Sequence, residues 1–60
     1  MSDEQKKLVL EYAELAFQRV GLKKTGQNVP IETIARLREI RVQLGLSEEV
    51  IMAQAQELVR

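Results

Sequence analysis

Residues 31–51 have the sequence IETIARLREIRVQLGLSEEVI, which contains the end of one helix and the start of another. Gly45 follows a run of good helix formers, at the position where glycine commonly ends a helix because it adopts the left-handed conformation without strain. Ser47 comes two residues later as an N-cap, and the two glutamates after it suit the positive end of a helix dipole. We therefore expect helices over about residues 31–44 and 48–60, joined by a short turn.

A further helix precedes this pair, and its start is marked by a capping box. Ser2 is followed three residues later by Gln5, the spacing at which each side chain accepts a hydrogen bond from the other residue's backbone N–H. Helix formers continue to Gly21, where we expect the helix to end in a Schellman motif, so the predicted helix covers about residues 3–20. Residues 22–29 are polar and rich in turn formers, which predicts a loop.

The chain is short for a stable domain. Sixty residues permit a single helical domain, residues 1–60, and a chain of this length leaves much of its surface exposed. It contains no cysteine, so no disulfide bond can compensate. The predicted fold is all-α, either a small three-helix bundle or a helical hairpin plus a third helix, completed by oligomerisation.

Two of the predicted helices have more apolar surface than a three-helix monomer can cover. On the first helix, apolar residues occupy somewhat more than half of the circumference at about 100° per residue. On the second, Ile31, Ala35 and Val42 lie on one side, Leu37, Ile40 and Leu44 lie on another, and Ile34 lies between them. The surplus is explained either by a central helix with incompletely covered edges or by an interface with a second copy or another protein.

The charges cancel overall but are unevenly distributed. Residues 19–41 contain six bases and two acids, a net charge of +4, and the segments on either side each have a net charge of −2. One explanation is that oppositely charged helices pack against each other within the domain. The other is a basic central strip that contacts an acidic protein or a phosphate backbone.

The composition gives no support for catalysis or for cofactor binding. Histidine and cysteine are absent, so the common general base, the common metal ligand and the thiol nucleophile are all missing. We expect no enzyme activity, no metal or other cofactor and no small-molecule substrate. The acidic N-terminus lacks the features of a signal peptide, and no apolar run is long enough for a membrane span, which predicts a cytoplasmic protein.

We therefore expect a small protein–protein interaction module, such as a regulator, adaptor or inhibitor, that binds through apolar helix faces as a homo-oligomer. Arg38 and Arg41 lie between apolar neighbours, where arginine often pairs with carboxylates at the edge of an interface. The candidate interface residues are Leu8, Tyr12, Leu15, Phe17, Ile34, Leu37, Arg38, Ile40 and Arg41.

One stretch suggests an alternative. Residues 34–51, IARLREIRVQLGLSEEVI, resemble the helix–glycine–helix segment after the winged helix-turn-helix of MerR-type regulators and of the related modulators of DnaJ-like co-chaperones. Residues 17–24, FQRVGLKK, resemble the helix end before the wing in the same family. The resemblance implies a degenerate helix-turn-helix protein that binds DNA or regulates transcription, with salt-dependent affinity through Lys23, Lys24, Arg36 and Arg38. Nucleic-acid binding is nevertheless not expected, because the last helix begins with two glutamates and its only base is Arg60.

Overall fold

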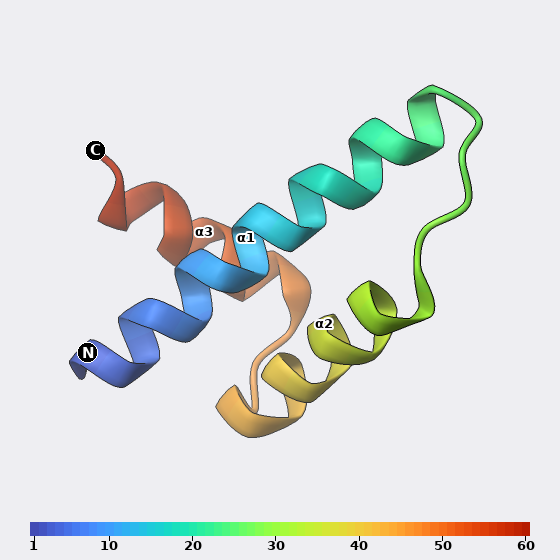
Figure 1. The fold of residues 1–60 in the computed structure, drawn as a ribbon. Coiled ribbons are helices and arrows are strands. Elements are labelled where there is room, and N and C mark those ends of the chain that lie inside the picture. Colours follow the sequence, from blue (N-terminus) through green and yellow to red (C-terminus); the bar gives the residue numbers. More distant parts are fainter.

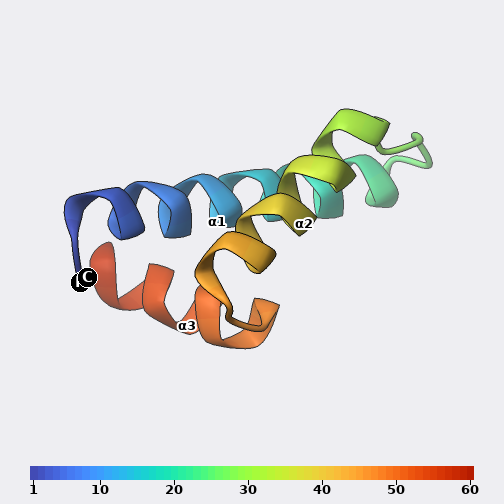
Figure 2. The same cartoon turned by 90° about the horizontal axis from the view of Figure 1, so that it is seen from below.

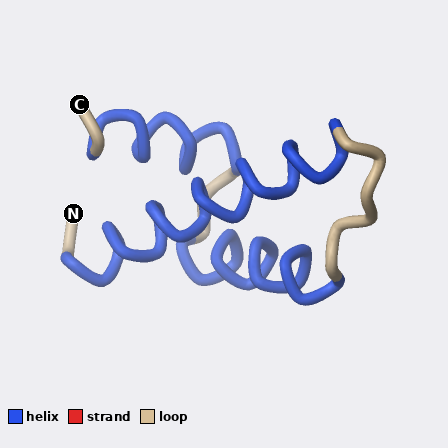
Figure 3. Tube along the Cα trace, turned by 45° about the horizontal axis from the view of Figure 1, so that its top comes forward, coloured by secondary structure: helices blue, strands red, loops and turns tan.

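The computed structural model describes all of residues 1–60 and contains three α-helices and no strand. These are α1 (Asp3–Lys24), α2 (Ile31–Leu44) and α3 (Glu48–Leu58), so the all-α prediction is confirmed (Figure 1). Both shorter helices pack against α1, which makes α1 the central element. The N- and C-termini lie at the same end of the molecule, and the loop that joins α1 to α2 lies at the opposite end (Figures 2 and 3).

The start of α1 confirms the predicted capping box. The Ser2 hydroxyl accepts a hydrogen bond from the Gln5 N–H at 3.2 Å, and the Gln5 side-chain oxygen accepts one from the Ser2 N–H, also at 3.2 Å. Two N–H groups that have no partner within the helix are thereby satisfied.

The end of α1 differs from the prediction. The helix continues through Gly21 to Lys24, and the residue with the left-handed conformation is Gly26, with φ of 75°. The N–H of Gly26 donates to the carbonyl of Lys23 at 3.1 Å, and the next N–H donates to the carbonyl five residues before it at 2.9 Å, the two bonds of a Schellman motif. Either glycine permits such an end. The two lysines after Gly21 favour the longer helix, because they are good helix formers and stabilise the negative end of its dipole.

The turn between α2 and α3 has the predicted form. Gly45 adopts the left-handed conformation with φ of 67°, and its N–H donates to the carbonyl four residues earlier at 2.8 Å. The Ser47 hydroxyl accepts from the N–H of Val50 at 3.4 Å. Helix α2 has the predicted bounds, whereas α3 ends at Leu58, two residues earlier than expected.

The core is small and lies where α2 and α3 cross α1. It consists of eight buried residues: Val9, Tyr12, Ala13, Ala16, Leu37, Ile40, Ile51 and Ala55. Several large apolar side chains remain exposed outside it, on all three helices. The helices lack the combination of length and apolar character that crossing a membrane requires.

Candidate protein-binding surface

The nine candidate interface residues do not form one surface. Tyr12, Leu37 and Ile40 are fully buried in the core, so a partner that binds this structure cannot contact them. Leu8 and Leu15 are half-buried and pack against the core from its edge. These five residues lie in the core or pack against it, so they stabilise the fold.

The other candidates are accessible to different degrees. Phe17 and Ile34 expose 68% and 52% of their surface. Arg38 is exposed and makes no hydrogen bond or ion pair within the chain, whereas Arg41 is half-buried and donates to the Tyr12 hydroxyl at 3.3 Å. Arg38 therefore has a guanidinium group free for a partner, and Arg41 helps to hold α2 against α1.

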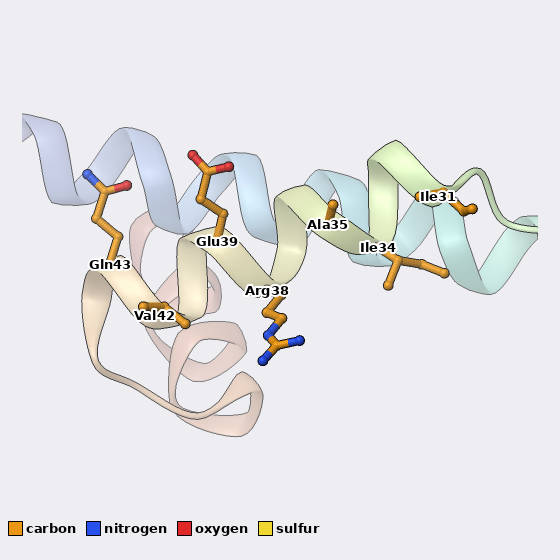
Figure 4. Close-up of a pocket in the computed structure, with 7 residues that line it drawn as sticks. All are labelled: Ile31, Ile34, Ala35, Arg38, Glu39, Val42 and Gln43. Carbon is orange, nitrogen blue, oxygen red and sulfur yellow. The ribbon is translucent and has the colours of Figure 1, made fainter.

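Helix α2 has a second apolar side that faces away from α1. At about 100° per residue, the buried side of the helix and this exposed side lie opposite each other. Ile31 and Val42 expose 80% and 74% of their surface, and Arg38 projects from the same side (Figure 4). We call this side the outer face of α2; it consists of Ile31, Ile34, Ala35, Arg38 and Val42, with the polar side chains of Glu39 and Gln43 at its edge. A helix that is apolar on both sides is normally covered on both.

The candidate set omitted Ile31, Ala35 and Val42, which carry most of this face. The sequence already predicted that these three residues lie on one side of the helix. The sequence did not show which of the two apolar sides of α2 packs on α1, because that choice depends on contacts between helices.

A second apolar surface is a groove between α1 and α3. Ala13 and Ala55 are buried at its floor, and their small side chains leave space between the two helices. Phe17 and Val59 form exposed walls, with 68% and 72% of their surface accessible. We call this surface the α1–α3 groove; it consists of Leu10, Ala13, Phe17, Met52, Ala55, Gln56 and Val59.

An arginine–carboxylate pair fixes α2 on α1. Arg36 donates to both carboxylate oxygens of Glu11, at 2.6 and 2.9 Å, and also to Glu39 at 2.8 Å. The hydrogen bond from Arg36 lowers the pKa of Glu11 below its ordinary value, and the same contact raises the pKa of Arg36. Opposite charges on α1 and α2 are thus paired inside the domain, as one explanation of the charge pattern predicted.

A second polar network joins all three helices beside the core and includes Arg41 of α2, which donates to the Tyr12 hydroxyl. The Tyr12 hydroxyl donates to a Glu48 oxygen at 2.8 Å, and Arg19 donates to the same oxygen at 2.7 Å. The hydrogen bond from Tyr12, together with that from Arg19, lowers the pKa of Glu48. Burial, and then the contact with Glu48, raises the pKa of Tyr12. Because Tyr12 is on α1 and Glu48 begins α3, this network sets the position of α3.

Comparison of the chain with protein-family models, with curated proteins and with solved structures found no match. No three acidic side chains come together in a group that could hold a metal ion. Two features stand out from an ordinary surface because they expose large apolar side chains: the outer face of α2 and the α1–α3 groove.

Proposed function

We propose that this chain is a protein–protein interaction module of the cytoplasm that works as a homo-oligomer and associates through the outer face of α2. The observation that carries the proposal is the exposure of Ile31 and Val42 on a helix whose opposite side is already buried. Exposed apolar side chains at this spacing are typical of a helix that packs on another protein.

The small core supports the same proposal. Only eight of the sixty residues are buried, so packing within one chain covers a limited part of the apolar surface. Association that covers the outer face of α2 removes more apolar surface from water and stabilises the folded chain by mass action. A self-associating chain obtains this stabilisation without any other protein.

The alternative, a MerR-like DNA-binding protein, has less support from the side chains on α3. Glu49 and Glu57 are exposed on this helix, and its neighbouring base, Arg60, pairs with Glu57 at 3.6 Å. Carboxylates at these positions repel the phosphate backbone that a reading helix must approach.

Site-specific photo-crosslinking tests the proposal. A photoreactive amino acid replaces Val42 in the purified chain, and a matched control carries it at Gln18, an exposed position on α1 outside both apolar surfaces. We expect covalent dimers from the probe at position 42 and few from the control. The proposal fails when the probe at position 42 gives no more dimer than the control.

A further inference from the structure

We infer that the outer face of α2 binds the α1–α3 groove of a second copy, so that the chains associate head to tail. The inference rests on the proposed function and adds the identity of the surface that covers the outer face. Three properties of the two surfaces support it: their shapes, their lengths and their charges.

The shapes are complementary. The outer face of α2 projects as a ridge, because every residue that forms it belongs to one helix, and its side chains border a shallow open pocket. The α1–α3 groove is concave, with Ala13 and Ala55 at its floor and larger side chains from both helices at its walls. An apolar side chain of the ridge that enters this groove would contact α1 and α3 together, as the anchoring side chains of a helix do when the helix binds along a groove.

The lengths also match. Ile31 and Val42 mark the ends of the ridge and are separated by about 16 Å along the helix axis at 1.5 Å per residue. On the receiving side, the groove itself extends along α1 from Leu10 to Phe17, about 10 Å, and the exposed Val20 next to it continues the apolar surface of α1 to about 15 Å. The exposed apolar part of α1 therefore extends over about the length of the ridge.

The charges are complementary as well. Arg38 lies within the ridge and has no partner in its own chain. Beside the groove, Glu14 lies one turn from Leu10 and Phe17 on α1, and Glu49 lies where α3 begins. Both glutamates are exposed and form no ion pair within the chain. A docked ridge would bring an unpaired cation to a groove with unpaired carboxylates at its edge.

Pairing of two outer faces with each other lacks this complementarity. In an antiparallel pair that places Ile31 opposite Val42, Arg38 lies opposite Ala35, and the two copies of Arg38 are about 4.5 Å apart along the helix axis. Each guanidinium group would then lie near the other's positive charge, and the nearest acid, Glu39, already accepts a hydrogen bond from Arg36. Like charges in an interface are unfavourable, so the groove of a second copy is a better partner for the outer face than a second outer face is.

In the head-to-tail arrangement that we infer, one chain uses its ridge on one neighbour and its groove on another, which is possible because the two surfaces consist of different residues. Such a heterologous contact continues into a ring or an open chain of copies, whereas an isologous contact stops at a dimer. This difference makes the inference testable by mixing variants.

The experiment uses two full-length variants, each altered at one surface. Val42→Glu places an acid on the ridge that must enter an apolar groove with carboxylates at its edge, and Phe17→Arg places a base in the groove that must receive Arg38. Both positions are mostly exposed, so both variants should fold, which circular dichroism checks. Gln18→Arg serves as the charge-matched control for Phe17→Arg. Each altered surface should weaken association by roughly ten- to a hundredfold.

Sedimentation equilibrium then measures the masses of the variants alone and mixed in equal amounts. We expect each variant alone to be monomeric and the mixture to form a dimer of one chain of each kind, since one intact ridge meets one intact groove. The control should associate like the wild type.

The other outcomes overturn the inference in distinguishable ways. If Phe17→Arg still dimerises while Val42→Glu does not, the outer face binds another outer face, and the proposed function stands without the head-to-tail arrangement. A wild-type chain that is monomeric, or variants that all associate like the wild type, would overturn the inference and self-association through this face together.

Discussion

The two sides of α2 can be compared directly by replacing Ile40 and Ile31 with alanine, one at a time. Ile40 is fully buried, so its truncation removes apolar contacts and leaves a cavity, at a cost of about 3 kcal/mol. A chain of this length has a free energy of unfolding of roughly 3 to 9 kcal/mol. Ile40→Ala should therefore lower the melting temperature by roughly 12 to 24 °C or leave the chain partly unfolded at room temperature.

Ile31→Ala should behave differently, although the chemical change is the same. Ile31 exposes 80% of its surface, so at low protein concentration its truncation should change the free energy of unfolding by less than about 0.5 kcal/mol. At high concentration the wild type gains stability from association, and the variant should gain less. Thermal unfolding followed by circular dichroism at two protein concentrations measures both effects. Equal losses for Ile40→Ala and Ile31→Ala at low concentration would refute the assignment of the two sides of α2.

Three further predictions concern the polar contacts and the helix end. Tyr12→Phe removes a hydrogen bond to the Glu48 carboxylate and should lower the free energy of unfolding by about 1.5 kcal/mol, measured as a fall in melting temperature of roughly 6 to 12 °C. An unchanged melting temperature would contradict the role of this hydrogen bond. The pKa values of Glu11 and Glu48 are lowered in the folded chain, so the free energy of unfolding should be constant near neutral pH and fall as the pH drops below the ordinary carboxyl pKa of about 4.3. Glu→Gln at both positions should flatten this pH dependence. A wild-type profile as flat as that of the variant would contradict the prediction. Gly21→Ala should stabilise α1 by about 0.4 to 1 kcal/mol, because Gly21 is helical and has open space around it, whereas Gly26→Ala should destabilise α1 because φ of Gly26 is positive. Denaturant titration measures both changes in the free energy of unfolding. The opposite order of stability would place the end of α1 at Gly21.

The parts of the fold that depend on neighbouring residues could be predicted from the sequence. The cap at Ser2, the left-handed Gly45 and the cap at Ser47 each involve contacts within a few residues, and all three are present in the structure. The end of α1 was harder to predict, because Gly21 and Gly26 both satisfy the local requirement. The choice depends on the helix propensity of the residues between them.

The parts that depend on contacts between helices could not be predicted in the same way. Leu37 and Ile31 are both apolar residues on α2, and only the packing on α1 makes one buried and the other exposed. The pair between Arg36 and Glu11 joins residues 25 positions apart, so no local pattern indicates it. The surplus of apolar surface was visible in the sequence, but its location on the outer face of α2 follows from the three-dimensional arrangement.

The mass of the wild-type chain in solution tests the central claim most directly. Sedimentation velocity over about a hundredfold range of concentration would show whether the 6.9 kDa chain associates, with the double variant Ile31→Ser, Val42→Ser as the comparison. If the chain associates through the outer face of α2, the wild-type sedimentation coefficient rises with concentration, while the double variant keeps its helix content and stays monomeric. A wild-type chain that remains a folded monomer at every concentration, indistinguishable from the double variant, would contradict this prediction.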